Sequence, residues 1–280
     1  MVSFYELEKR PEVLSEVTLG PIGDKKVAIS DVAIISGASS GIGQATAVQL
    51  AARGVRVVIG TFPGDPHDPT KTQSLISAIG GQCVIHEVDV RDSNQVDEFA
   101  NRAISEYGQL DIAVANAGIL RNAALADMTD ALWDDMLQVD LTGVLRTFRS
   151  ASKVMKSSGH LIAVSSIAGA VYGWPDHAHY ATAKAGLLGL VRSLAVELAP
   201  RGITVNSVVP GIIESPQSLD PVNSLGPEGL RIIAGSIPAG RVGTPDDVAG
   251  LIDFLASAKA SYISGQAIIV DGAYTVRLPV

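Results

Sequence analysis

The chain has 280 residues, of which 47% are hydrophobic and 18% are charged, so it can build a sizeable core and is not a largely disordered protein. Its net charge of −8 disfavours a nucleic-acid partner. A single cysteine, Cys83, excludes an intrachain disulfide, and the five histidines lack the spacing of a metal site. No leader-like start and no apolar run of about 18 residues is present. We therefore expect a soluble, cytoplasmic protein with no membrane segment and no bound metal.

Short runs rich in β-branched residues alternate along the chain with longer segments of helical periodicity. The runs predict seven strands, at Val32–Ser36, Val55–Ile59, Cys83–Val90, Ile112–Ala115, Leu161–Ser165, Ile203–Val209 and Ala267–Val270. Helices are predicted at Ile42–Arg53, Ser93–Tyr107, Thr129–Met155 and Ala181–Leu198. This alternation predicts an α/β fold, in which helices cover both faces of a seven-stranded parallel sheet. No linker or repeat marks a second domain, so residues 32–280 are expected to form a single doubly wound domain.

Three stretches fall outside the alternation. Residues 1–31 form an N-terminal extension, in which a short helix at Phe4–Val17 and an extended piece at Lys26–Ser30 fit the pattern. Residues 62–72 contain three prolines and are expected to form a loop. Residues 210–243 contain five prolines and are expected to form a long irregular loop of the kind that covers an active site.

A glycine-rich segment joins the first predicted strand to the first helix. It reads Ser36-Gly37-Ala38-Ser39-Ser40-Gly41-Ile42-Gly43. Glycines tolerate the positive φ of a strand-to-helix turn and let a pyrophosphate approach the backbone closely. The helix that follows offers free N–H groups and a positive dipole end to that anion. The segment therefore predicts a dinucleotide site, and the alternative is a tight turn that binds nothing.

A tyrosine and a lysine four residues apart, Tyr180 and Lys184, are predicted on one face of a helix. A free phenol has a pKa of about 10, and a nearby ammonium favours its phenolate form. The pair therefore suits proton exchange with a substrate oxygen. Ser165 and Ser166 end the fifth strand, where a hydroxyl could hold that oxygen while charge builds on it.

Further motifs occur in a fixed order along the chain. They are Asp89-Val90, Asn116-Ala117-Gly118, Ser165-Ser166, Tyr180-x-x-x-Lys184, Pro210-Gly211 and Asp271-Gly272. With the glycine segment, they resemble the classical short-chain dehydrogenase/reductase family over residues 32–274. The resemblance implies a Rossmann-type fold and an NAD(P)-dependent oxidoreductase. Such an enzyme transfers a hydride between nicotinamide and a carbonyl or secondary alcohol of a small molecule, and its subunits form a homo-oligomer, either a dimer or a homotetramer.

The resemblance also implies residue roles. It assigns acid/base catalysis to Tyr180, substrate-oxygen binding to Ser166 with Ser165 as the alternative, and both lowering of the tyrosine pKa and ribose binding to Lys184. It places the cofactor on Gly37, Ser39, Ser40, Gly41, Ile42, Gly43, Thr61, Asp89, Val90, Asn116, Ala117, Gly118, Tyr180, Lys184, Pro210, Gly211, Ile213 and Ser215. Asp89 would bind the adenine amino group, or else cap the next helix.

The choice between NADP and NAD depends on the end of the second strand. Thr61 stands where NAD-preferring relatives have an acidic residue, and a neutral side chain does not repel a 2′-phosphate. Arg53, His67 or Lys71 could reach that phosphate. We therefore favour NADP as the cofactor, with NAD left open.

One position departs from the family pattern. Asp140 stands where the family has an asparagine that anchors a water in a proton relay. A buried Asp140 could be protonated and mimic asparagine, or its charge could pair with Lys184. This departure motivates a second hypothesis, a cofactor-binding protein with little catalysis, and a third is a non-redox epimerase or dehydratase. Tyr172, Trp174, His177 and His179 precede Tyr180 and either line the substrate pocket or pack a loop.

Overall fold

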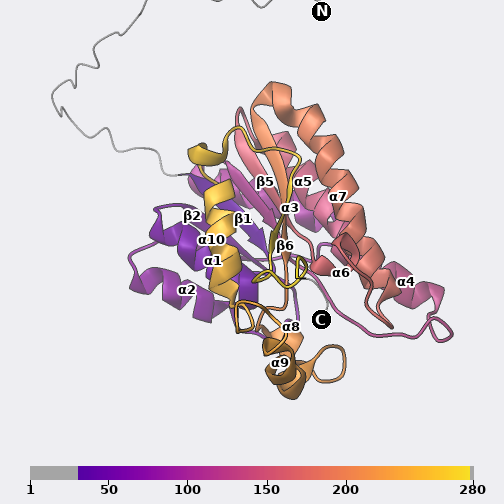
Figure 1. Cartoon of the computed structure of the whole chain (residues 1–280). Helices are drawn as coiled ribbons and strands as arrows, with labels where there is room; N and C mark the ends of the chain where they lie inside the picture. The colour runs from indigo at the N-terminus through magenta and orange to yellow at the C-terminus, as the bar shows by residue number, and fades with distance from the viewer. Residues whose placement is uncertain (1–30, 278–280) are drawn as a thin grey trace, which may run out of the picture.

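The computed structural model describes residues 31–277, so the helix and the extended piece expected within residues 1–30 lie outside the described residues. A seven-stranded sheet in the order β3-β2-β1-β4-β5-β6-β7 forms its centre, and every neighbouring pair of strands is parallel. The strands are β1 (Val32–Ser36), β2 (Arg56–Thr61), β3 (Cys83–Glu87), β4 (Ile112–Ala115), β5 (Gly159–Val164), β6 (Ile203–Pro210) and β7 (Ala267–Val270). The expected α/β fold with a seven-stranded parallel sheet is confirmed (Figure 1).

Helices cover both faces of this sheet, as the continuous apolar strands predict. They are α1 (Gly41–Ala52), α2 (Pro69–Ala78), α3 (Ser93–Tyr107), α4 (Asp130–Leu137), α5 (Gly143–Val154), α6 (Ile167–Ala170), α7 (Ala178–Leu198), α8 (Pro216–Leu219), α9 (Gly226–Ala234) and α10 (Pro245–Leu255). Buried side chains of α3, α5 and α7 form one core with the sheet, and those of α1, α2 and α10 form the other (Figure 1). No helix within residues 31–277 is long and apolar enough to cross a membrane.

Two loop predictions are wrong. Residues 62–72 do not form a loop throughout, because α2 begins at Pro69. Proline suits the first turn of a helix, where its missing N–H is not needed, and the Asp68 side chain accepts a hydrogen bond from the N–H of Thr70 as an N-cap. Residues 210–243 likewise contain α8 and α9, each with a proline in its first turn.

The helix expected at Thr129–Met155 is interrupted in its middle. A π-helical turn, η1 (Gln138–Thr142), joins α4 to α5 without a break in the chain path. Single π turns inside α-helices are rare and occur frequently at functional sites. This one contains Asp140, whose side chain is fully buried.

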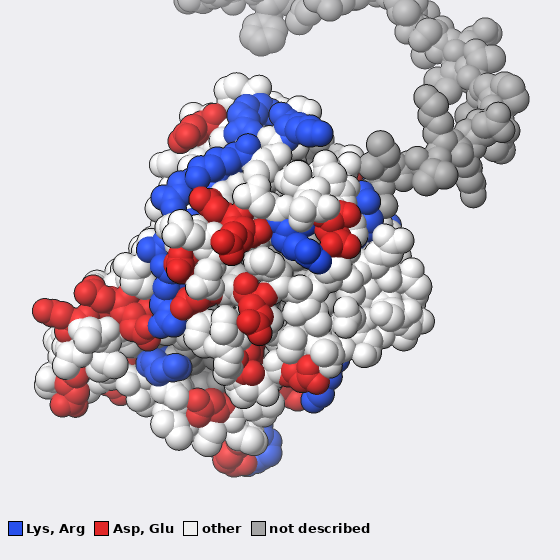
Figure 2. All heavy atoms as spheres, turned by 180° about the vertical axis from the view of Figure 1, so that it is seen from behind, with Lys and Arg blue, Asp and Glu red and all other residues white. Residues whose placement is uncertain are grey.

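Charged side chains mix on the face opposite to that of Figure 1. Figure 2 shows acidic and basic residues side by side there. Ion pairs such as Arg102–Glu106 at 2.9 Å and Lys153–Asp97 at 3.5 Å are formed on α3 and α5. These half-exposed ion pairs contribute little to the stability of the fold. Because acidic and basic side chains alternate, this face has no uniformly basic surface.

Candidate active site

A cleft of about 840 Å³ opens at the carboxyl ends of the central strands. In a doubly wound sheet, ligands bind at this edge, where the strand order reverses between β1 and β4. Its volume suits a cofactor together with a small substrate. Its lining includes most of the residues assigned from the sequence: Gly37, Ser40, Gly41, Ile42, Asp89, Val90, Asn116, Ala117, Gly118, Asp140, Ser166, Tyr180, Lys184, Pro210, Gly211, Ile213 and Ser215.

The glycine turn is packed so tightly that two of its glycines cannot carry a side chain. Gly37 has φ of +66°, and a Cβ there would lie 2.9 Å from the Cα of Ala117. A Cβ on Gly43 would lie 2.2 Å from the carbonyl oxygen of Gly37. Asn116 fixes the turn from β4, because its amide nitrogen donates to the carbonyl oxygens of Ser36 at 3.1 Å and Gly37 at 2.9 Å. This tight packing brings the start of α1 directly to the cleft.

The first turn of α1 fits an anionic ligand. Ser40 is the N-cap residue, yet its side chain makes no capping hydrogen bond. The first backbone N–H groups of a helix have no partner within it, and the helix dipole is positive at this end. The glycines leave the backbone bare at the same place. The residues present therefore fit the pyrophosphate of a dinucleotide cofactor.

The sequence predicts that Ser39 and Thr61 contact the cofactor, but in the structure neither residue faces the cleft. The Ser39 hydroxyl donates to the Thr61 hydroxyl at 2.8 Å, and both side chains are buried. Their hydrogen bond instead ties the glycine turn to the end of β2. Neither Ser39 nor Thr61 is among the residues that line the cleft.

Of the three residues expected to reach a 2′-phosphate, His67 alone lines the cleft. Arg53 instead pairs with Asp253 of α10 at 2.6 Å, because it ends α1 far from the glycine turn. Lys71 lies on α2 beside a separate shallow hollow. Two further cations, Arg91 and Arg121, line the cleft and are not predicted from the sequence.

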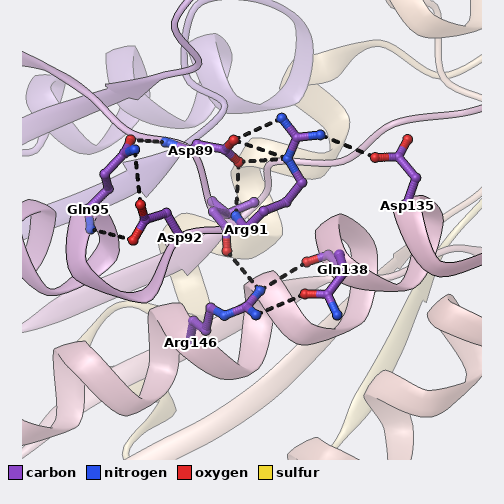
Figure 3. Close-up of polar contacts among 8 residues, drawn as sticks. Asp89, Arg91, Asp92, Gln95, Asp135, Gln138 and Arg146 are labelled. Atoms are coloured by element: carbon purple, nitrogen blue, oxygen red, sulfur yellow. Dashed lines mark hydrogen bonds and ion pairs between the residues drawn. The ribbon is translucent and has the colours of Figure 1, made fainter. Parts of the chain in front are cut away.

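Arg91 holds the carboxylate that was assigned to adenine. Its guanidinium donates to both Asp89 oxygens, with a shortest distance of 2.8 Å, and to Asp135 of α4 at 3.2 Å (Figure 3). It also lies 5.5 Å from the ring centroid of Phe62. Arg91 lowers the pKa of Asp89, chiefly by hydrogen bonding, so Asp89 stays ionised. Asp89 does not cap α3, since Asp92 is the N-cap.

The chemical end of the cleft lies between β5 and α7. Tyr180 and Lys184 stand one turn apart on α7, and the Lys184 Nζ is 5.6 Å from the centroid of the tyrosine ring. Ser166 lowers the pKa of the Tyr180 phenol, and its hydroxyl accepts a hydrogen bond from the N–H of Ala168 at 3.1 Å. Ser165, the alternative, donates its hydroxyl to the Lys184 carbonyl oxygen at 2.8 Å, which holds α7 against β5. Ser166 is therefore the serine that the fold brings to Tyr180.

Asp140 forms a buried ion pair with Lys184. Its Oδ2 lies 3.0 Å from the Lys184 Nζ, and its Oδ1 accepts the N–H of Ile119 at 2.8 Å. Lys184 also donates a hydrogen bond to the Val164 carbonyl oxygen at 3.1 Å. A Cβ on Gly118 would lie 3.0 Å from the Asp140 Oδ2, so glycine there leaves room for the pair. Of the two possibilities for Asp140, the geometry favours pairing with Lys184.

The three titratable groups act on one another. Burial raises the pKa of Tyr180, Lys184 opposes that rise, and the Asp140 charge adds to it. Burial lowers the pKa of Lys184, but Asp140 and Tyr180 together outweigh it and keep the pKa above its ordinary value. Burial raises the pKa of Asp140 against the opposing pull of Lys184 and the Ile119 N–H. Asp140 thus raises the pKa of Lys184 and counteracts the lowering of the Tyr180 pKa by Lys184.

The outer end of the cleft is lined by aromatic and apolar side chains. The rings of Trp174 and Tyr180 meet edge-on with centroids 6.4 Å apart, and Tyr172 meets Tyr274 similarly at 6.2 Å. Trp174 and Tyr172 therefore line the pocket, as one of the two sequence interpretations holds. His177 and His179 are buried behind this lining.

Ser215 and Ile213 stand beside Pro210 and Gly211 where β6 ends, and all four line the cleft. The Ser215 hydroxyl accepts the N–H of Ser218 at 3.3 Å, so it caps α8. A Cβ on Gly211 would lie 2.6 Å from the Cβ of Asp271, so the Pro210-Gly211 and Asp271-Gly272 motifs pack directly against each other.

Comparison with known proteins agrees with this geometry. A family model described as enoyl-(acyl carrier protein) reductase matches residues 37–275. The chain belongs to the short-chain dehydrogenase/reductase family. It is an NAD(P)-dependent oxidoreductase, and the relatives give no support to the hypothesis of a cofactor-binding protein with little catalysis.

Relatives match along nearly their whole length. The 3-oxoacyl-[acyl-carrier-protein] reductase FabG of Staphylococcus aureus is 39% identical over 86% of this chain and 96% of its own. FabG of Thermotoga maritima is 36% identical over 88% and 98%. Among solved structures, a short-chain dehydrogenase/reductase from Mycobacterium marinum has a TM-score of 0.82 and 34% identity, covering 89% of this chain and 97% of its own. Levodione reductase has a TM-score of 0.82 and 27% identity, with coverage of 89% and 98%.

Proposed function

We propose that this enzyme reduces the carbonyl of a small ketone to a secondary alcohol, and catalyses the reverse oxidation, with Tyr180 as the acid/base. The observation that carries the proposal is the meeting of three groups in one cleft: the Ser166 hydroxyl, the Tyr180 phenol and the Lys184 ammonium. The glycine turn opens into the same cleft. A dinucleotide held at that turn would extend toward these groups.

The roles of the side chains follow from their chemistry. When bound, the nicotinamide cofactor supplies the hydride that reaches the carbonyl carbon. The Ser166 hydroxyl donates a hydrogen bond to the substrate oxygen, where negative charge develops. Tyr180 gives its proton to that oxygen, and the C=O bond becomes CH–OH. Lys184 stabilises the resulting phenolate and donates a hydrogen bond to the cofactor ribose.

We further propose that NADP(H) is preferred over NAD(H). Arg91, a permanent cation, lines the cleft together with the His67 imidazole, while Thr61 supplies no negative charge at the end of β2. A 2′-phosphate carries charge that such cations attract. Asp89 offsets part of this attraction, because it already accepts two hydrogen bonds from Arg91.

A second candidate activity comes from the relatives, which are named as 3-oxoacyl-[acyl-carrier-protein] reductases at 36–39% identity. Their name describes substrates that carry a keto group at carbon 3 of an acyl thioester. The same three catalytic groups would reduce that keto group. The two candidates therefore differ in what the outer end of the cleft accepts.

Turnover with a substrate panel tests the proposal. Ring ketones, aryl methyl ketones and a 3-oxoacyl thioester are offered with NADPH and with NADH, and absorbance of the reduced cofactor is followed. We expect NADPH to be consumed with at least one ketone. Consumption with the thioester alone would select the second candidate. No consumption with any carbonyl, together with conversion of a substrate at constant NADPH absorbance, would instead support an epimerase or dehydratase.

The cytoplasmic location and the homo-oligomer remain predictions. Apolar side chains on neighbouring helices support self-association, since Leu132 of α4 is 41% exposed, Leu145 of α5 is 37% exposed and Val196 of α7 is 78% exposed.

A further inference from the structure

His177 joins two loops at the outer end of the cleft. Its side chain is buried at the start of α7, with 5% of the residue exposed. Its Nδ1 lies 2.6 Å from the Pro175 carbonyl oxygen, and its Nε2 lies 3.2 Å from the Asn223 carbonyl oxygen. The imidazole also stacks on Trp174, with ring centroids 3.9 Å apart and planes at 13°. One side chain thus contacts the loop before α7 and the loop between α8 and α9.

The second of these loops, residues 220–225, is shaped to present its carbonyl groups. We call it the lid loop. The Asp220 carboxylate accepts the N–H groups of Val222 at 2.8 Å and Asn223 at 3.4 Å, and the Asn223 amide at 2.8 Å. The Val222 carbonyl oxygen accepts from the Asn122 amide at 2.9 Å. Two adjacent carbonyls of the lid loop are therefore bound by side chains from two other segments.

Trp174 is held just as firmly on the other side of His177. Asp176 has φ of +60°, and its carbonyl oxygen accepts the N–H of Ala123 at 2.8 Å. A non-glycine residue takes such a conformation only where its surroundings enforce it. In the same loop, the Trp174 indole meets the Tyr180 ring edge-on.

We propose that His177 is a positioning residue that sets substrate selectivity: it holds the lid loop against Trp174 and closes the pocket around a flat apolar group next to the carbonyl. This inference rests on the ketone reduction proposed above. Flat rings pack well against aromatic edges and apolar walls. The walls here share that character and are formed by Leu120, Ile167, Tyr172, Trp174, Leu225, Ile233 and Tyr274.

Substitutions at this one position separate the contributions of the ring. His177→Phe keeps a flat ring for Trp174 and removes both ring nitrogens that face the Pro175 and Asn223 carbonyl oxygens. His177→Gln places an amide N–H at about the reach of Nε2 and preserves the bond to the lid loop. His177→Asn reaches only as far as Nδ1 and preserves the bond to Pro175. A neutral imidazole donates to one carbonyl and an imidazolium to both, whereas the glutamine amide can always donate.

Two measurements on the full-length enzyme with NADPH read the effect. The first compares KM and kcat for an aryl methyl ketone and for acetone. In His177→Phe we expect KM for the aryl ketone to rise roughly fivefold to tenfold while kcat stays within about twofold, because the three catalytic groups are untouched. The KM for acetone, which lacks the ring, should change less. His177→Gln should restore the wild-type preference, and His177→Asn should not.

The second measurement needs no turnover. Hydrogen exchange by mass spectrometry follows the amides of the lid loop, which we expect to exchange faster in His177→Phe and His177→Asn and at the wild-type rate in His177→Gln. Equal exchange and equal substrate preference in all three variants would overturn the proposal. So would a fall in kcat with unchanged KM. If the His177 variants fail to fold, Asn122→Ala removes the other tie to the lid loop and should shift preference and exchange in the same direction; no shift in either would overturn the proposal.

The two proposals fail separately. A wild-type enzyme that reduces neither ketone contradicts the proposed ketone reduction, while lid-loop exchange still shows whether His177 holds the loop. An enzyme that reduces both ketones, with variants that leave preference and exchange unchanged, contradicts only the role of His177.

Discussion

The two ends of the cleft are built by different means. At the cofactor end, backbone packs on backbone, as where Gly43 leaves no room for a Cβ beside Gly37. At the substrate end, side chains such as His177 and Asn122 reach across to carbonyl groups of another loop. Backbone packing suits the binding of one constant ligand, the cofactor. Side-chain hydrogen bonds between loops can be altered by substitution without disturbing the strands. The difference places the chemistry on rigid elements and the selectivity on loops.

The largest effect is expected where the two ends meet. Tyr180→Phe removes the hydroxyl that transfers the proton, and kcat should fall by about 10²–10⁴-fold. The dissociation constant of NADPH, measured by fluorescence titration, should change by less than about threefold, because the glycine turn is intact. Tyr262→Phe, at a fully exposed tyrosine, serves as the control. A Tyr180→Phe enzyme with near-normal kcat would remove the acid/base role from this residue.

The next effect tests the rigidity of the cofactor end. Gly43→Ala should weaken NADPH binding by roughly 10–100-fold, because its Cβ would lie 2.2 Å from the Gly37 oxygen and 2.6 Å from the Asn116 amide nitrogen. The free energy of unfolding should also fall, by roughly 1–3 kcal/mol. Gly189→Ala on α7 is the matched control, since nothing lies within 4 Å of its Cβ. Unchanged NADPH affinity in Gly43→Ala would show that the glycine turn can shift to accommodate the added methyl group.

The smallest effect concerns the charge balance at Tyr180. The Asp140 charge raises the pKa of the phenol, so Asp140→Asn should lower that pKa. Alcohol oxidation needs the phenolate, and its rate should therefore rise at a lower pH in the variant than in the wild type. Carbonyl reduction needs the phenol and should lose rate at a correspondingly lower pH. Profiles that coincide, or a shift to higher pH, would contradict this electrostatic role.

The sequence predicts best what depends on neighbours along the chain. The strands, the glycine turn and the pairing of Tyr180 with Lys184 are visible because local spacing determines them. The start of α2 was missed although Asp68 and Pro69 are ordinary helix-start residues, since three prolines outweighed that signal.

Other features depend on contacts that no local pattern records. Arg91 binds a carboxylate two residues away and another on α4. The contact of His177 with the lid loop depends on the tertiary fold, which brings the Asn223 carbonyl oxygen beside the imidazole. Thr61 stands at the expected strand end, but its pairing with Ser39 depends on how the glycine turn folds back. Side-chain orientation at such places follows from tertiary packing, so the cofactor preference could not be derived from residue type alone.

The π turn at Gln138–Thr142 has a geometric consequence for the helix that carries it. In a regular α-helix, residues three apart share a face. Here Asp140 meets Lys184, while Gly143 packs where a Cβ would lie 2.8 Å from the Val90 side chain. The wider winding of the π turn lets one continuous helix contact both Lys184 and Val90. A helix shortened by a single residue would be more regular, but it could not keep both the Asp140–Lys184 ion pair and the close packing of Gly143 on Val90.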